Sequence, residues 1–443
     1  MTADVRQLKT SAELALAEAF ASARHRLPGD AAASALRSAA FCHFLATGLP
    51  HRQIEDWRYT DLRALMRDAK PLASPPDADA KGCAMGAGRI VAGVDCRRVV
   101  IVNGAFAPDL SDLRGLERGL TIRSMAGALA GGDPVVTRHL GKLGPMDNVA
   151  VALNTALMGD GVVIRIAAGT DVARPLHLVF MTVGAKSTAA FTRSLVVLED
   201  GARATLIETH EGPPDCDYQI NTALELLVGA GAEVEHVKIT AEGSEALHVA
   251  TLMASLGARA HLRDTSFTSG GAAIRNQLFL YFEGTDAVAD IRGANMLHAR
   301  QHVDTLLHAD HKAGQCRSHE LFKAVVDDDA RSIFQGRITV RPHAQKTDAR
   351  MMTRALLLSD TAEAISKPEL EIYADDVQCG HGATSGALDG ELKFYLMARG
   401  IPAREAETLL VQAFIGEAID GVQHAGLREA LTNATTAWLA ARR

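Results

Sequence analysis

A turn-and-strand unit recurs through the middle of the chain. In each unit an apolar run meets a tight polar turn, and an alternation of small and apolar residues opens the next strand. The units are centred on Ala202, Ala232, Ala258, Ala287, Ala330 and Ala362. Side chains alternate across a β-strand, so Ala258, Ala260 and Leu262 share one face. We therefore expect Ala202, Ala232 and Ala258 to stack in a packed interior.

The spacing of these units predicts the fold class. A repeat of roughly 25 to 45 residues is too short to bury its own apolar face, and such repeats are typical of solenoids. Little helical periodicity lies between the units, which favours a β-helix. A β-sandwich with Gly and Asp turns is the alternative that this pattern leaves open.

The N-terminal region has helical signals instead. Thr10 and Glu13 form a capping-box pattern ahead of an alanine-rich helix. Asp30 is placed to cap a second helix, which Gly48 ends. Residues 71–88 are rich in Pro, Ala, Gly and Asp, and this composition predicts a linker before the strand-rich region.

The helical pattern returns after Asp389, where a short helix is predicted to stop at Gly400. Two apolar stripes follow at helical spacing: Ala406, Leu409, Leu410, Ala413 and Phe414, then Leu427, Leu431, Ala434 and Trp438. The first stripe either binds a partner or only packs on the second. The predicted domains are a helical domain with linker (1–95), a β-helix core (96–388) and a C-terminal helical domain (389–443).

Composition narrows the classes of function. The net charge is −7 and no basic block is present, which disfavours nucleic-acid and anionic membrane partners. The first residues contain no apolar signal region and no long apolar run occurs, so we expect a cytoplasmic protein. The six cysteines are scattered without a Cys-x-x-Cys pair, which argues against a disulfide framework or a zinc knuckle.

The densest candidate chemistry lies in residues 375–386, where Cys379 and His381 share one strand face. A thiolate beside an imidazole can bind iron or zinc, although packing with a hydrogen-bonded histidine is the alternative. A second cluster contains His302, His308, His311, Cys316 and His319. Strand alternation divides these histidines between two faces, so we interpret them as surface and core residues. No complete nucleotide-binding loop or hydrolase motif is present.

Four segments resemble the SufB/SufD family of iron-sulfur cluster assembly proteins. They are FQGRITVRPHAQKTDA (334–349), LLLSDTAEAISKPELEIYADDVQCGHGATSG (356–386), FYLMARGIP (394–402) and EDWRYTDL (55–62). The last of these is similar to the SufD branch in particular. The resemblance implies a right-handed parallel β-helix flanked by N-terminal and C-terminal helical domains. It also implies a non-catalytic subunit that pairs with SufB and with the ATPase SufC.

The resemblance also separates the two branches of the family. Ala362 stands where SufB-type chains have a cysteine that accepts sulfur, and Gly382 replaces a SufB glutamate. His381 matches the SufD histidine at the SufB interface, so it is the expected metal ligand shared with SufB, with Cys379 as a lesser candidate. The C-terminal helices, including the first apolar stripe, match the region through which the family contacts SufC.

The resemblance implies no tightly bound cofactor on the chain alone and a transient iron-sulfur cluster at the SufB interface. It leaves open a flavin in the complex and self-association of the isolated chain. Two alternatives are less favoured. A SufB-like scaffold conflicts with Ala362 and Gly382, and a carbohydrate-active β-helix enzyme conflicts with the missing export signal and carboxylate cluster.

Overall fold

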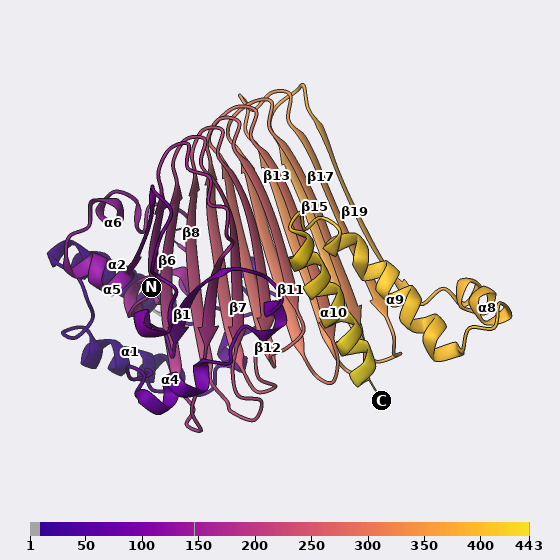
Figure 1. Cartoon of the computed structure of the whole chain (residues 1–443), viewed down its shortest axis with the longest axis horizontal. Coiled ribbons are helices and arrows are strands. Elements are labelled where there is room, and N and C mark those ends of the chain that lie inside the picture. The colour runs from indigo at the N-terminus through magenta and orange to yellow at the C-terminus, as the bar shows by residue number, and fades with distance from the viewer. Residues whose placement is uncertain (1–8, 146, 443) are drawn as a thin grey trace, which may run out of the picture.

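The chain winds into a parallel β-helix of about eight turns with helices near both ends, as the computed structural model in Figure 1 shows. The structure describes residues 9–145 and 147–442. From β4 onward successive strands alternate between two sheets, and neighbours within a sheet are parallel except for the pairs β1–β2 and β3–β4. The solenoid prediction is confirmed, and the β-sandwich alternative is wrong because the strands pair in parallel with those of the next turn.

In the described residues the larger sheet has ten strands: β1 (Arg97–Val102), β2 (Ala105–Phe106), β5 (Leu176–Met181), β7 (Arg203–Glu211), β9 (Glu233–Ala241), β11 (His261–Thr268), β13 (Val288–Leu297), β15 (Arg317–Val326), β17 (Asp348–Leu357) and β19 (Gln378–Ala387). The smaller sheet has nine: β3 (Leu120–Ser124), β4 (Val162–Ile166), β6 (Ala189–Leu198), β8 (Gln219–Val228), β10 (Leu247–Leu256), β12 (Ala273–Phe282), β14 (His302–His311), β16 (Arg331–Val340) and β18 (Glu363–Ile372). We call them the ten-strand and nine-strand sheets.

A column of small residues runs along one edge of the β-helix, at the turns that lead into the ten-strand sheet. Ala202, Ala232, Ala260 and Ala287 are fully buried there. Each carbonyl in the column accepts a backbone hydrogen bond from the next turn, as in Glu233 N to Ala202 O at 2.9 Å. Stacked turns approach this closely only where side chains are small.

The expectation for Ala258 is wrong, because Ala258 lies in the turn itself and Ala260 takes the buried place. In the earlier turns a glycine, Gly201 or Gly231, occupies the left-handed position just before the stacked alanine. In this turn Arg259 adopts that conformation with φ +57°. Left-handed backbone is uncommon for residues other than glycine, so the sequence pattern suggests that Gly257 holds this position. Aligning the repeat on Gly257 selects Ala258, two residues before the alanine that is actually stacked.

The six repeat units belong to two different rows of turns. Ala330 and Ala362 lie at turns that lead into the nine-strand sheet, where Glu363 N donates to Ala330 O at 3.0 Å. The repeat in the sequence is therefore a mixture of the two turns that make one full coil. Both turns demand small residues for the same reason of close stacking.

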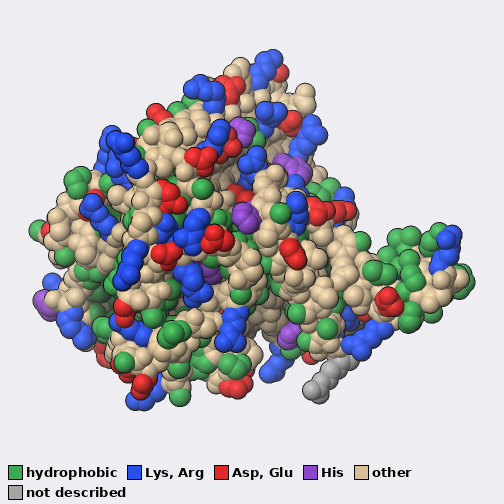
Figure 2. Space-filling model, in the orientation of Figure 1, with side chains coloured by type: hydrophobic (Ala, Val, Ile, Leu, Met, Phe, Trp, Pro, Cys, Tyr) green, Lys and Arg blue, Asp and Glu red, His purple; other side chains and the backbone are tan. Residues whose placement is uncertain are grey.

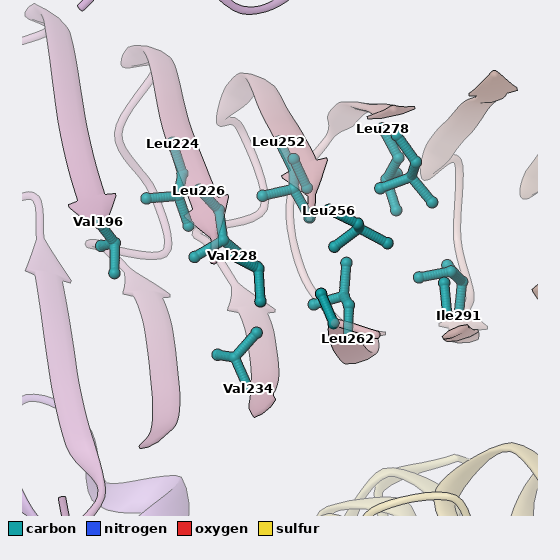
Figure 3. Packing of buried hydrophobic residues seen from close by; sticks show 14 of the residues in the cluster. Val196, Leu224, Leu226, Val228, Val234, Leu252, Leu256, Leu262, Leu278 and Ile291 are labelled. Atoms are coloured by element: carbon teal, nitrogen blue, oxygen red, sulfur yellow. The ribbon is translucent and has the colours of Figure 1, made fainter. Parts of the chain in front are cut away.

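The apolar core lies between the two sheets. Leu224, Leu226 and Val228 of β8 project toward Val234 of β9 and Leu262 of β11, and the same arrangement continues along the coil (Figure 3). These side chains are almost fully buried. Burying each of them contributes ~1.5 to 3 kcal/mol before the entropy of ordering is subtracted.

Helices cover the outer faces of both sheets. The described helices are α1 (Ser11–Ala23), α2 (Ala31–Thr47), η1 (Glu55–Trp57), α3 (Leu62–Leu65), α4 (Ala78–Ala84), η2 (Arg89–Val91), η3 (Pro108–Leu110), α5 (Met125–Ala130), α6 (Pro134–His139), α7 (Val149–Leu157), α8 (Gly390–Ala398), α9 (Ala403–Ile419) and α10 (Ala425–Ala441). Helices α1, α2 and α7 pack on the nine-strand sheet, whereas α9 and α10 pack on the ten-strand sheet (Figure 1).

The predicted helix signals mostly hold. Thr10 and Glu13 make both bonds of a capping box, Asp30 caps α2, and Gly48 ends α2 with φ +71°. The predicted linker is not entirely irregular, because Asp77 caps helix α4 inside it. Among the described helices none is both long and apolar enough to cross a membrane. The division into three domains stays a prediction.

Replacing Ala260 with Leu should lower the free energy of unfolding by ~1 to 3 kcal/mol, because extra methylene groups would overpack the stacked column. Ala258→Leu is the matched control, since its side chain lies in a half-buried turn, and it should cost less than half as much. Urea unfolding of both variants measures the difference. An equal cost at the two positions would contradict the assignment of the column.

Candidate functional site at the open end of the β-helix

The two ends of the β-helix differ. At the first end β2 pairs with β1 and β3 pairs with β4 in antiparallel fashion, which closes both sheets with short or reversed strands. At the other end β18 and β19 are the last strands of their sheets, and no further strand of the described chain pairs with their free edges. A free edge exposes unpaired backbone N–H and C=O groups, so it is a template for pairing with another chain.

Cys379 and His381 both lie on this last strand. Their register partners on β17 are Ala349 and Met351, whose buried side chains belong to the interior cluster. Cys379 and His381 therefore lie on the face of β19 that continues the interior of the β-helix, at its open end. His381 is exposed and Cys379 is half-buried. Within the described residues no third histidine, cysteine or carboxylate lies close enough to complete a three-ligand metal site with them.

Glycines occupy three of the five positions on the opposite face of β19. A Cβ atom added at Gly380 or at Gly386 would meet no other atom within 4 Å. At Gly382 an added Cβ would meet only the flexible end of Met352, with Cε at 2.6 Å. Another polypeptide can therefore approach the β19 backbone closely.

A groove of about 620 Å³ follows this end of the ten-strand sheet to helix α9. It is lined by His319, Leu321, Arg350, Met351, Met352, Arg354, Gln378, Cys379, Gly380, His381, Gly382 and Glu417. Glu417 of α9 forms an ion pair with Lys323 of β15 and lies 3.6 Å from the Arg354 guanidinium. The hydrogen bond from Lys323 lowers the pKa of Glu417. These charges connect the C-terminal helices directly to the groove.

The sequence did not identify Arg350, Arg354 or Glu417 as part of the site. Arg350 and Arg354 lie an even number of residues apart on β17, which is the one signal that they share a face. Nothing in the sequence places Glu417 beside them, because that contact depends on how α9 packs against the sheet.

The Cys379 thiol is a weaker candidate than the His381 imidazole. Burial raises the pKa of Cys379, and the nearby Asp348 and Glu320 carboxylates add to the rise. The thiol form is therefore favoured near neutral pH, whereas metal binding and nucleophilic attack need the thiolate.

Glu320 lies behind the open end, on the interior face of β15. It is fully buried, and neither of its carboxylate oxygens accepts a hydrogen bond within the described residues. Burial raises the pKa of Glu320 to about 7. A carboxyl group with this pKa exchanges a proton near neutral pH.

The histidine-rich stretch divides as its alternation indicates within β14, but His319 lies on the next strand and does not share the face of His311. His302 and His308 lie on the nine-strand sheet beside Thr60 and Asp56 of the N-terminal region. His311 faces the interior, where it stacks on Phe282 with ring centroids 4.0 Å apart. His319 lies on the outer face of β15, and its hydrogen bond to Asp290 raises its pKa.

The first C-terminal stripe does not form one exposed surface. Ala406 is fully buried, and the Phe414 ring packs under the Lys323 ammonium at 4.4 Å, whereas Leu409 and Ala413 are exposed. The larger exposed apolar group lies on the preceding helix α8, at Leu392, Phe394, Tyr395 and Met397. Phe394 is 72% exposed, and hydrophobic side chains gather on the projecting end of the molecule that carries α8 (Figure 2).

Replacing Glu320 with Gln should change the pH dependence of stability. The folded-state pKa of about 7 lies above the ordinary glutamate value of 4.5, so the stabilising effect of the neutral carboxyl is complete below about pH 4.5. It is lost as the pH rises through 7, and the loss is on the order of 3 kcal/mol. Wild-type stability should therefore fall relative to Glu320→Gln between about pH 5 and pH 8.

Chemical denaturation across this range measures the difference. Glu245→Gln is the control, because Glu245 is an exposed glutamate in a turn and its replacement should leave the wild-type pH profile unchanged. A stability difference between wild type and Glu320→Gln that does not vary with pH would show that Glu320 does not titrate in this range.

Comparison with known proteins agrees with the geometry. Residues 180–414 match the SUF system FeS cluster assembly SufBD core domain, and residues 10–178 match the SufBD protein N-terminal region. The chain is 32% identical to the iron-sulfur cluster assembly protein SufD of Escherichia coli, over 87% of this chain and 88% of that protein. It is 31% identical to a SufBD family protein of Synechocystis, over 86% of this chain and 85% of that protein. It is 28% identical to SufD of Bacillus subtilis, over 64% of this chain and 65% of that protein.

Ala362 is buried in a small apolar cluster with Val326 and Ala330, and Gly382 lies beside Met352. Two of the relatives above are SufD proteins, so the SufB-like alternative is not favoured. In the EDWRYTDL segment Trp57 is buried under the Arg275 guanidinium at 4.6 Å, which anchors the segment on the nine-strand sheet. The chain belongs to the SufBD family of iron-sulfur cluster assembly proteins, and it is similar to SufD.

Proposed function

We propose that this chain is a non-catalytic subunit that pairs with a SufB-type protein through the open end of its β-helix and recruits a SufC-type ATPase through its C-terminal helices. An iron-sulfur cluster is the cargo, assembled between the two β-helices with His381 as this chain's ligand. The observation that carries the proposal is the free, glycine-rich strand β19 with the exposed His381.

An incomplete ligand set supports a shared site. Within the described residues His381 and Cys379 are joined by no third ligand, and a metal or cluster needs three or four. A second chain that pairs with the free edge of β19 can supply the others, because that edge leaves backbone N–H and C=O groups available for pairing. Glu320 and the arginines of the groove then lie next to the joint site.

The apolar surface of α8 supports the ATPase contact. Phe394 and Tyr395 are more than half exposed, and they lie on a helix that projects away from the β-helix (Figure 1). Aromatic side chains are common anchors of protein interfaces. Lys393 forms a 2.9 Å ion pair with Glu407 of α9. Helix α9 in turn reaches the groove at Glu417, so a contact on α8 can act on the cluster site.

Replacing His381 with Ala should reduce cluster formation to background while leaving the fold and the complex intact, because the exposed imidazole supports no core packing. Co-purification with the SufB-type and SufC-type partners, followed by iron and sulfide analysis after reconstitution, measures both effects.

One comparison variant and one control variant accompany this test. Cys379→Ser should retain more cluster than His381→Ala, because the protonated thiol is the weaker ligand. His343→Ala is the control, since His343 lies in an exposed turn between β16 and β17. The proposed role of His381 fails if the His381→Ala complex still assembles clusters normally, or if the complex simply dissociates.

Replacing Phe394 with Glu should weaken ATPase binding by ~2 kcal/mol, roughly a thirtyfold change in Kd, because it removes an aromatic anchor and buries a charge. Met85→Glu is the matched control, as Met85 is 70% exposed at the end of α4. Deleting α9 and α10 is a poorer test, since it would uncover the outer face of the ten-strand sheet. Equal binding by the two variants, measured by titration calorimetry, would exclude α8 as the docking helix.

A further inference from the structure

The interior of the β-helix is apolar near one row of turns and polar near the other. At the polar end the inward-facing side chains include Glu208 and His210 of β7, His236 and Lys238 of β9, and His248 of β10, with Glu242 in the turn between β9 and β10. Most of these side chains are over nine-tenths buried. One ligand atom each from His210, Glu242 and His248 can be chosen so that all three lie within 4.8 Å of one another.

We propose that His210, Glu242 and His248 bind one divalent transition-metal ion of the zinc class inside the β-helix. Two imidazoles and a carboxylate are a common ligand set for zinc. The family resemblance implies no such bound group. The site is also separate from His381, because β7 and β19 are separated in their sheet by the strands β9 to β17.

His210 offers a buried nitrogen to a metal ion. Its Nε2 lies 3.4 Å from Oε2 of Glu208. A proton on Nε2 donates to that carboxylate oxygen and leaves the lone pair of Nδ1 free. That Nδ1 is buried without a hydrogen-bond partner. A carboxylate–histidine pair with a free second nitrogen is the usual arrangement behind a metal-bound histidine.

Glu242 and His248 lie side by side. Nε2 of His248 lies 2.9 Å from the Thr222 hydroxyl, and its Nδ1 lies 3.1 Å from Oε1 of Glu242. In this arrangement the buried Nδ1 makes no hydrogen bond of good geometry within the described residues, so it can bind a metal ion together with Oε1. The Tyr218 hydroxyl donates to the other oxygen, Oε2, at 2.6 Å and so fixes the carboxylate.

A proton is the competing occupant, because the tautomer of His248 that carries it on Nδ1 can donate to Glu242 and accept from the Thr222 hydroxyl. A metal ion would take the place of that proton and bind the neutral imidazole.

Buried carboxylates surround the site. Glu208, Glu242 and Asp264 are all more than nine-tenths buried. Nδ1 of His236 lies 2.6 Å from Oδ1 of Asp264, whereas the Lys238 ammonium donates to Asn276. Buried carboxylates are costly unless a cation pairs with them, which favours metal binding here.

There is room for an ion or a water molecule. A cavity of about 20 Å³ is lined by His210, Thr222 and Glu242 together with Phe180. A cavity of this size holds roughly one water molecule. The Phe180 ring stacks on the His210 ring with centroids 4.5 Å apart, which holds the imidazole in place.

The test uses the full chain carrying Cys379→Ser and His381→Ala, so that the open end cannot contribute ligands. After unfolding with a chelator and refolding with Zn²⁺, we expect one zinc per chain to remain after gel filtration. The zinc X-ray absorption spectrum should show nitrogen and oxygen ligands and no sulfur. This spectrum identifies the site even if a ligand variant does not fold.

Variants then locate the metal. His210→Asn and Glu242→Gln should abolish stoichiometric binding. Tyr218→Phe, which removes only the supporting hydroxyl, should weaken zinc affinity by about tenfold to a hundredfold. His319→Asn is the control on the outer surface and should bind normally.

Three outcomes would overturn the proposal. A folded chain that retains only trace zinc would show that a proton balances the cluster instead. Sulfur in the zinc coordination shell would place the metal at a cysteine elsewhere. Unchanged binding by folded His210→Asn and Glu242→Gln would do the same. None of these results would affect the proposal for His381, which is tested by cluster formation in the complex.

Discussion

Backbone hydrogen bonding between successive turns is the constraint on which the rest of this structure depends. From β4 onward each strand pairs in parallel with the strand one full coil away, so every coil must follow nearly the same path as the one before it. This requirement explains the fully buried small residues at the turns, from Ala202 to Ala287, and the left-handed residues beside them. It also explains the uniform ten-residue strands from β12 onward, because a longer or shorter strand would displace the next turn.

The helices do not enter this coil but cover its two outer faces. On the nine-strand sheet the coverage includes a buried ion pair, Arg193 with Glu225 at 2.7 Å, and the Arg193 guanidinium also donates to Asn154 of α7. Such a pair is stabilising only while all of its hydrogen bonds are made, so it favours one way of docking α7 on the sheet. On the ten-strand sheet Lys323 has a similar function for α9, through Glu417 and the Phe414 carbonyl.

The two ends of the solenoid have different structures. Short or antiparallel strands close the first end, whereas the last coil leaves its edges, its interior and a groove accessible. The same contacts that attach α9 to the sheet also line that groove, so the C-terminal helices and the open end form one connected region. The geometry therefore makes the last coil the part of the chain to test for function.

The sequence by itself determined the solenoid, the helical flanks, their caps and the segment that carries His381. These features depend on local rules: strand alternation, turn residues, capping and short motifs. Only the tertiary structure showed that the repeats form two rows of turns, that Arg259 displaces Ala258 from the stack, and that Ala406 is buried while Phe394 is exposed. It also assembled Glu417 with Arg354, and His210 with His248, from separate coils. Such contacts depend on how coils stack and helices dock, and residue spacing along one strand does not encode them.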